Sequence, residues 1–198
     1  EIAMYHIPVM KDETVGALRV EKDKTYLDCT LGGGGHTGAV IALGGNVVAI
    51  DRDSDAIEYC KSHITGNVTY IKGQYENALS LLREAGIERI AGAMMDLGVS
   101  SKQLDDPSRG FSYRFDSPLD MRMDKSQKLT AADVVNGYGP RELADILRKY
   151  GEESFAKRIT DAIVRRREKA KIETTGELGK IVCDSVPYRK SGHKKKKT

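Results

Sequence analysis

Four consecutive glycines lie within the segment Asp28-Cys29-Thr30-Leu31-Gly32-Gly33-Gly34-Gly35-His36-Thr37-Gly38. The segment follows a short apolar run and opens a helical stretch, so it is expected to join a strand to a helix. Consecutive glycines let a backbone approach a ligand closely, and the N–H groups at a helix N-terminus point at that ligand. A tight turn alone would need only one or two glycines. The pattern therefore favours a ligand-binding loop.

Strand-like and helical stretches alternate around this loop. Helical patterns lie near His36–Leu43, Asp55–His63 and Glu76–Ala85, and apolar β-type runs occur at Thr25–Cys29, Asn46–Ile50, Val68–Ile71 and Ile90–Met95. Strands that alternate with helices at this spacing predict a parallel α/β sheet with right-handed crossovers.

The second half of the chain has a different pattern. Ser100–Lys128 reads as a long ordered loop, and long loops in compact domains are usually functional. Three helices are expected after it. The first begins at Pro140 and has Gly151 just past its end, the second spans about Glu153–Lys169, and the third begins at the capping box Thr174-x-x-Glu177. We therefore expect a cofactor-binding domain at residues 1–128 and a basic helical domain at residues 129–198.

The net charge of +3 is unevenly distributed. Residues 140–198 hold 17 lysines and arginines against 9 acids, a balance of +8, whereas residues 1–139 have a balance of −5. A basic region on an acidic body indicates either a surface for a polyanion or ordinary solvated helix faces. Arg165–Arg167 fan out around the second helix, so some of them are expected to face solvent or a polyanion.

Composition excludes several classes of protein. No apolar run approaches the roughly 18 residues that a membrane span needs, and no secretory signal is visible. The three cysteines, Cys29, Cys60 and Cys183, are odd in number and far apart. They predict neither a disulfide framework nor a zinc site, and they fit a reducing cytoplasm. We expect no metal and no membrane partner, and the sequence leaves a homodimer open.

Two cofactors fit the glycine loop. Gly33-x-Gly35-x-x-Gly38 satisfies the dinucleotide fingerprint, and Asp51 ends the second strand where an acid that binds ribose belongs. Asp28, however, precedes the glycines, and a carboxylate there would repel a pyrophosphate but attract an ammonium group. This spacing fits S-adenosylmethionine better than NAD, which stays open as the alternative.

Asp96 ends the fourth strand, in Asp96-Leu97-Gly98-Val99-Ser100-Ser101. Because ligands of open α/β sheets bind beyond the carboxyl ends of the strands, Asp96 is expected at the same rim as Asp28 and Asp51. A helix N-cap or a turn is the structural alternative for this residue.

Several motifs along the chain match those of a known family. The chain closely resembles the bacterial small-subunit (16S) ribosomal RNA cytosine-N4 methyltransferase family, RsmH or MraW, over essentially its whole length. The matching segments are His6–Val9, Asp28–His36, Asp51–Asp53, Asp96–Ser101, Gln103–Ser112, Pro118–Asp124, Thr130–Val134, Tyr150–Glu153 and Thr174–Leu178. The Arg-Gly-Phe and Pro-Leu-Asp-Met-Arg-Met-Asp motifs are long enough to be specific to this family.

The resemblance implies a Rossmann-like class I methyltransferase sheet with a small helical insert. It implies methyl transfer from S-adenosylmethionine to the N4 amine of a cytidine in the decoding centre, with 16S ribosomal RNA or the small subunit as partner. The implied cofactor-binding residues are Gly34, Gly35, His36, Asp51, Tyr75, Asp96 and Gln103. The family commonly has Phe at the position of Tyr75.

Two departures from the family pattern stand out. The family continues with a Thr-Phe-Gln segment, further strands and a Ser-Phe-His-Ser-Leu-Glu-Asp-Arg motif, none of which occurs here. Gly192-His193 is also followed directly by four lysines, where the family has Pro-Ala before a basic pair. We therefore expect a partial or stitched version of a longer protein, whose sheet lacks its later strands.

The expected chemistry needs an acceptor for the amine hydrogens, because the lone pair of cytosine N4 is delocalised into the ring. We assign this catalytic role to Asp96, with the Leu97 carbonyl, and Asp96 could instead serve the cofactor only. Phe111, Tyr113 and Phe115 are candidates to hold a flipped base or to lie in a core, and Arg109, Arg114 and Arg122 are candidates for phosphate contacts.

Two rival functions remain open from the sequence alone. An NAD-dependent dehydrogenase would use the same glycine loop with Asp51. A catalytically silent RNA-binding module would follow if the missing strands left cofactor binding too weak for turnover.

Overall fold

A computed structural model describes residues 8–187 of the chain. The expectations for His6, Ile7 and the lysine run 194–197 lie outside the described residues. Within residues 8–187, no helix is long and apolar enough to cross a membrane.

The chain forms two compact units. The first contains residues 1–105 and 123–126, and the second contains residues 106–122 and 127–198. The sequence placed the boundary at residue 128, so most of the long loop groups with the helices instead. The roles assigned to the two domains remain predictions.

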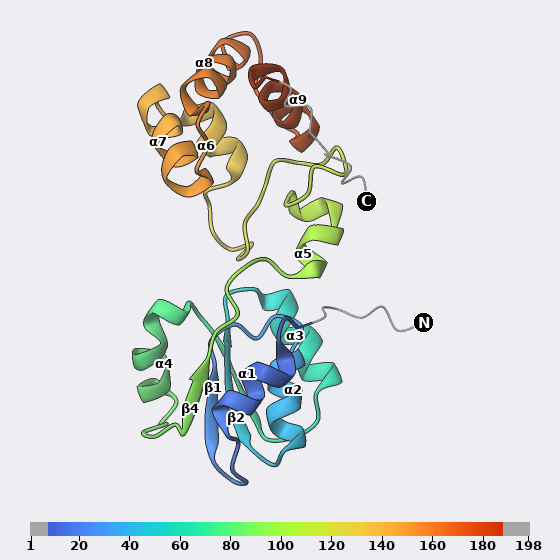
Figure 1. The fold of residues 1–198 in the computed structure, drawn as a ribbon, viewed down its shortest axis with the longest axis vertical. Coiled ribbons are helices and arrows are strands. Elements are labelled where there is room, and N and C mark those ends of the chain that lie inside the picture. Colours follow the sequence, from blue (N-terminus) through green and yellow to red (C-terminus); the bar gives the residue numbers. More distant parts are fainter. Residues whose placement is uncertain (1–7, 188–198) are drawn as a thin grey trace, which may run out of the picture. The chain divides into compact units, whose positions relative to one another are not determined.

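The first unit is built on a four-stranded parallel sheet with the order β3-β2-β1-β4 (Figure 1). The strands are β1 (Thr25–Asp28), β2 (Asn46–Asp51), β3 (Val68–Lys72) and β4 (Gly92–Met94). In register, Asp28 of β1 lies beside Ala49 of β2 and Met94 of β4. The predicted parallel α/β sheet is confirmed. The chain runs from β1 outward to β3 and returns to the other side of β1, which places a topological switch point between β1 and β4.

Each face of the sheet has its own core because strand side chains alternate between faces. On one face, Tyr26, Val47 and Ala49 pack with Val40 and Ile57. On the other face, Leu27, Val48 and Ile50 of the strands pack with Leu82 and with Cys29, which directly follows β1. Helices α1, α2 and α3 thus cover one face and α4 covers the other (Figure 1).

The helices of this unit are α1 (Lys11–Leu18), α2 (Gly35–Ala42), α3 (Ser54–His63), the short 3₁₀ turn η1 (Tyr75–Asn77), α4 (Ala78–Glu84) and α5 (Ser101–Asp105). Helices α2, α3 and α4 connect successive strands, whereas α1 precedes β1 and α5 follows β4. Asp53 caps α3, since its side chain accepts a hydrogen bond from the Asp55 backbone N–H at 3.0 Å. Neither α1 nor α5 was predicted. Both are short, and α1 has only Val15 buried, so its apolar periodicity is weak.

The second unit contains the turn η2 (Pro107–Arg109) and four helices: α6 (Ala131–Gly137), α7 (Pro140–Gly151), α8 (Ala156–Arg167) and α9 (Thr175–Ser185). Their core contains Val135, Leu143, Ile159 and Ile163, together with Leu119 from the loop. The sequence predicted three helices and missed α6. That helix carries a full capping box between Thr130 and Asp133, a signal that was overlooked.

Two predicted helix ends need correction. Gly151 is the last residue of α7 rather than the residue past it, and Glu152 adopts the left-handed conformation that ends the helix. At α9, Thr174 does cap the Glu177 backbone N–H, at 3.2 Å. The Glu177 carboxylate instead accepts hydrogen bonds from the Glu173 backbone and from Arg166, so the predicted box is not reciprocal.

Candidate functional site

A cavity of about 470 Å³ lies in the first unit, along the carboxyl ends of the strands. Segments that follow all four strands contribute to its wall. The lining residues are Pro8, Val9, Cys29–Gly33, Gly35, His36, Asp51–Asp53, Ala56, Gly73, Tyr75, Asp96–Ser100, Gln103 and Met123. Of the seven residues assigned to the cofactor from the sequence, all but Gly34 line this cavity.

Gly34 is required by close packing, and its role in cofactor binding stays a prediction. It adopts a left-handed conformation with φ +74°, and a Cβ atom there would collide with the side chain of Ile64 and lie 2.8 Å from Cys60 Sγ. Gly35 is similarly restricted, because a Cβ would lie 2.6 Å from Pro8 Cγ. The glycine run is therefore required partly by close packing, which the count of glycines alone did not reveal.

Asp51 organises the loops around the cavity. Its Oδ2 accepts a hydrogen bond from the Gly32 N–H at 2.8 Å, and its Oδ1 accepts one from the Asp53 N–H at 2.9 Å. Burial raises the pKa of this carboxyl, although the two backbone hydrogen bonds oppose the change. A carboxylate has about four acceptor sites, so acceptor capacity remains for a ligand in the cavity.

Asp28 is a fully buried carboxyl at the end of β1. Its Oδ2 accepts a hydrogen bond from Thr37 Oγ1 at 2.7 Å, and its Oδ1 accepts one from the Thr30 N–H at 3.0 Å. Burial is the main influence on this group and raises its pKa. Within residues 8–187, Asp28 forms no ion pair, and His36 and Asp51 influence its charge only at a distance. A positively charged ligand group nearby would relieve this cost.

We predict that Asp28→Asn stabilises the protein without ligand at neutral pH. A raised pKa means that the folded state holds its proton more tightly than the unfolded chain, so stability is greatest below the ordinary value of 3.8 and declines as the pH rises through the folded pKa. Asn removes the charge; its Oδ1 can still accept from the Thr30 N–H, and its Nδ2 can donate to Thr37 Oγ1 once that hydroxyl rotates. Thermal melts from pH 4 to 8 should show a gain in Tm that grows with pH. A constant difference across this range would show that ionisation of Asp28 has no part in it.

Asp96 lies where two cavities meet. A smaller cavity of about 150 Å³ is lined by Val9, Met10, Thr14, Asp28, Thr30, His36, Met94, Met95 and Asp96. Thr30, His36 and Asp96 also line the large cavity. The Asp96 backbone N–H donates to Thr30 Oγ1 at 2.7 Å, which fixes the residue at the rim, and its side chain is exposed. His36 is buried, with Nε2 3.2 Å from the Val9 carbonyl oxygen.

Both polar atoms of the Gln103 side chain form hydrogen bonds within the protein. Its Nε2 donates to Asp53 Oδ2 at 2.9 Å, and its Oε1 accepts from the Ser100 N–H at 3.0 Å. Both Gln103 and Asp53 are buried. Gln103 thus ties the loop after β4 to the loop after β2, and it reaches the cavity as part of its wall.

Asp53 and Met123 are among the wall residues that had no assigned role from the sequence. Asp53 carried a recognisable signal, since an aspartate directly before an apolar helical pattern is a typical N-cap. Met123 carried none: it comes from the long loop, 50 residues beyond Gly73, and no local pattern places it at the cavity.

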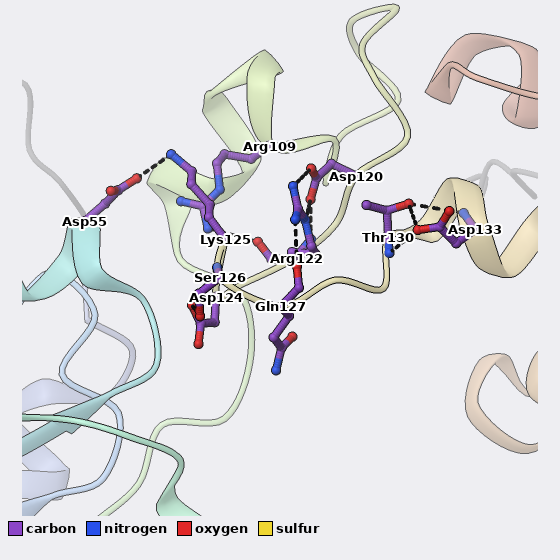
Figure 2. Close-up of polar contacts among 10 residues, drawn as sticks. All are labelled: Asp55, Arg109, Asp120, Arg122, Asp124, Lys125, Ser126, Gln127, Thr130 and Asp133. Atoms are coloured by element: carbon purple, nitrogen blue, oxygen red, sulfur yellow. Dashed lines mark hydrogen bonds and ion pairs between the residues drawn. The ribbon is translucent and has the colours of Figure 1, made fainter.

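Two of the three arginines proposed for phosphate contacts are structural. Arg109 is buried, with 2% of its surface exposed, and its Nη2 donates to the Arg122 carbonyl oxygen at 3.1 Å. Arg122 forms two hydrogen bonds to Asp120, and its Nη1 donates to the Gln127 carbonyl oxygen at 2.7 Å (Figure 2). The Arg122 guanidinium holds the pKa of Asp120 below its usual range. These side chains build the loop.

The arginines of α8 also include both side chains that form hydrogen bonds within the fold and an exposed side chain. Arg166 donates to the Ala170 carbonyl oxygen and to Glu177 of α9, and Arg167 donates to the Val135 carbonyl oxygen of α6, at 2.7–2.8 Å. Arg165 is exposed. Most of the positive balance also lies elsewhere, since residues 140–187 hold +2 and residues 188–198 hold +6.

The comparison with protein families decides the relationship. Residues 3–198 match the model of the MraW methylase family. The chain belongs to this family. The resemblance noted in the sequence is therefore confirmed.

Curated relatives carry the name "Ribosomal RNA small subunit methyltransferase H". The protein from Clostridium botulinum (strain Kyoto / Type A2) is 44% identical over 98% of this chain and 65% of its own length. The Fusobacterium nucleatum protein is 44% identical over 98% and 64%, and the Lactiplantibacillus plantarum protein is 44% identical over 93% and 60%. The chain thus spans a little less than two thirds of the length of these relatives.

Among solved structures, the C-terminal domain of precorrin-6Y C5,15-methyltransferase from Rhodobacter capsulatus matches with a TM-score of 0.41 and 21% identity. The match covers 50% of this chain and 57% of that one. The fold assignment therefore rests on the strand order and register of this protein.

Proposed function

We propose that this protein is an S-adenosylmethionine-dependent methyltransferase that methylates the N4 amine of a cytidine in the decoding centre of 16S ribosomal RNA. The observation that carries the proposal is the grouping of Asp28, Asp51 and Asp96 with the glycine loop at one edge of the sheet. Membership of the MraW methylase family and the names of the curated relatives support it.

The residues of the cavity fit this cofactor. Gly32 and Gly35 bring backbone to the wall, and Asp51 has acceptor capacity left for a ribose diol. Asp28, at the smaller cavity, offers a buried carboxylate to the ammonium of the amino-acid end. A dinucleotide would bring a pyrophosphate close to this acid, which disfavours NAD. When bound, S-adenosylmethionine supplies an electrophilic methyl group.

The remaining chemistry falls to the protein. Asp96 lines both cavities and is accessible, so its carboxylate can accept a hydrogen from the N4 amine and raise the electron density on that nitrogen. The Thr30 hydroxyl fixes the Asp96 backbone, and β4 is held in register with β1. Placement of N4 in line with the methyl group then supplies the proximity contribution. His36 binds and shapes the cavity wall.

For RNA we propose an exposed part of the long loop in the second unit. Tyr113 is 87% exposed and Phe115 is 45% exposed, so both rings are accessible for stacking on unpaired bases. Two arginines named in the sequence analysis as candidates for contact with a polyanion are exposed: Arg114, which lies between these rings, and Arg165 of α8. We assign no RNA contact to the arginines whose side chains form hydrogen bonds within the fold, which are Arg109, Arg122, Arg166 and Arg167.

The deciding experiment is transfer of a radiolabelled methyl group to small ribosomal subunits that lack the modification, followed by nucleoside analysis. N4-methylcytidine in the product is expected. A labelled nucleoside other than a cytidine would overturn the assigned acceptor. Titration with S-adenosylmethionine and with NAD separates the two cofactors, and binding of NAD alone would favour the dehydrogenase alternative.

We predict that Asp51→Ala weakens binding of S-adenosylmethionine by about 1–3 kcal/mol, because the ribose hydroxyls lose a charged acceptor and the Gly32 N–H loses its partner. Isothermal titration of both proteins measures the effect. An unchanged dissociation constant would take Asp51 out of the site.

A further inference from the structure

The four residues Met123–Ser126 form a loop that belongs to the first unit, although the residues on both sides of it belong to the second. We call this segment the strap. At its base, Arg122 Nη1 donates to the Gln127 carbonyl oxygen at 2.7 Å, which ties together the two residues that flank it (Figure 2). The Asp120 carboxylate holds the same guanidinium through two further hydrogen bonds. The strap is thus a short loop with a fixed base.

Two ion pairs attach the strap to the rest of the first unit. Lys125 Nζ lies 2.8 Å from Asp55 Oδ2 at the start of α3, as Figure 2 shows. Asp124 Oδ1 lies 3.4 Å from Lys72 Nζ at the end of β3. Asp124 also accepts hydrogen bonds from the backbone N–H and the hydroxyl of Ser126, at 3.0 and 2.7 Å. These hydrogen bonds, together with Lys72, lower the pKa of Asp124, so the carboxylate stays ionised.

Both attachment points adjoin the wall of the large cavity. Lys72 directly precedes the wall residue Gly73, and Asp55 directly precedes the wall residue Ala56. Met123, the first residue of the strap, is itself a wall residue. The two ion pairs therefore anchor the strap at the end of β3 and at the start of α3, next to the part of the cavity wall that Met123 lines.

This side of the cavity is the adenine side of the proposed cofactor. Asp96 follows β4, Asp51 is the last residue of β2, and Gly73 follows β3 at the far edge of the sheet. If the ribose lies at Asp51 and the methyl group lies toward Asp96, the adenine extends toward β3. A methionine thioether makes favourable contacts with aromatic rings, which suits it to pack against a nucleobase.

We propose that Met123 contacts the adenine of the cofactor and that the Lys125–Asp55 and Lys72–Asp124 ion pairs are positioning contacts that hold it there. The inference rests on the proposed function, because it takes S-adenosylmethionine as the ligand. It adds a cofactor contact and two positioning pairs to the residues assigned from the sequence.

Methyl-labelled methionine gives a direct readout. In the NMR spectrum of the whole protein, the Met123 methyl signal, assigned with Met123→Leu, should shift on addition of S-adenosylmethionine and of adenosine, but not of methionine. Met123→Ala should weaken cofactor binding about 3- to 10-fold, and Met123→Leu should retain it within about 2-fold. Binding of S-adenosylmethionine without a shift of this signal would refute the strap contact and leave the proposed function standing. Failure of the wild-type protein to bind either nucleoside would overturn both.

The ion pairs are tested with a matched control. Lys125→Met removes the charge and keeps most of the stem, and it should weaken cofactor binding about 2- to 5-fold at low salt, with a smaller effect at 1 M salt. Lys157→Met breaks the Lys157–Asp161 pair of α8, which has the same 2.8 Å length, and should leave binding unchanged. Equal effects of the two substitutions, or an effect of Lys125→Met that salt does not change, would overturn the positioning role.

Discussion

Asp96→Ala is expected to lower the rate of methyl transfer at saturating S-adenosylmethionine by about 100-fold or more, the scale of a lost proton acceptor. The carboxylate is the accessible acidic group that lines both cavities, and its backbone is fixed by Thr30 Oγ1. Removal of the side chain leaves the glycine loop and Asp51 unchanged, so the dissociation constant of the cofactor should change much less than the turnover number.

Single-turnover assays with undermethylated small subunits, at several cofactor concentrations, separate the two effects. Asp96→Asn retains a carbonyl oxygen that accepts a hydrogen bond, so it should keep more activity than Asp96→Ala. Thr30→Val should lower turnover by a smaller factor, because it releases the Asp96 backbone without removing the carboxylate. If turnover of Asp96→Ala recovers fully once the cofactor is saturating, Asp96 serves cofactor binding only.

The sheet could be predicted because its signals are local. β1 and β2 are short apolar runs whose residues are nearly all buried, and each ends in an acid, Asp28 or Asp51, at the same edge of the sheet. In a parallel sheet the carboxyl ends of the strands share one rim, so the order of strands and acids along the chain was enough to bring these residues together.

The arginines show why the loop could not be predicted. Arg109 and Arg165 both lie in polar, charged stretches of the sequence, yet the first is buried and the second is exposed. The difference depends on backbone partners that are distant in the sequence. Arg109 donates to the Arg122 carbonyl oxygen. Arg167, two residues after Arg165, donates to the Val135 carbonyl oxygen and is partly buried. Charge counts contain no information about such contacts.

Met123 illustrates the same limit at the candidate site. Its place at the cavity depends on ion pairs that span 70 residues between Lys125 and Asp55 and 52 residues between Asp124 and Lys72. No periodicity or short motif encodes pairs at these separations. The glycine loop, by contrast, is visible in the sequence as a local pattern. Its sequence does not show that Gly34 is required by close packing against Ile64.

The glycine of the Arg-Gly-Phe motif should be the most sensitive backbone position of the second unit. Gly110 adopts φ +69°, and a Cβ atom there would collide with the Pro118 carbonyl oxygen and lie 2.8 Å from the Asp120 backbone nitrogen. Both obstacles are backbone, so neither can rotate away. We expect Gly110→Ala to destabilise this unit by about 3 kcal/mol or more, from left-handed strain together with the collision.

Gly86→Ala is the matched control, because Gly86 has nearly the same φ, +70°, and nothing within 4 Å of its added Cβ. Gly86→Ala should lower the free energy of unfolding by about 1–2 kcal/mol, the cost of the left-handed strain alone. Denaturant unfolding of the two variants gives the difference, and hydrogen exchange locates it. The loss for Gly110→Ala should appear in the backbone amides around the loop, such as Met121 N–H, which donates to the Arg109 carbonyl oxygen at 3.0 Å. If Gly110→Ala costs no more than Gly86→Ala, the loop yields to the methyl group, and the close approach of residues 110 and 118 is not required for stability.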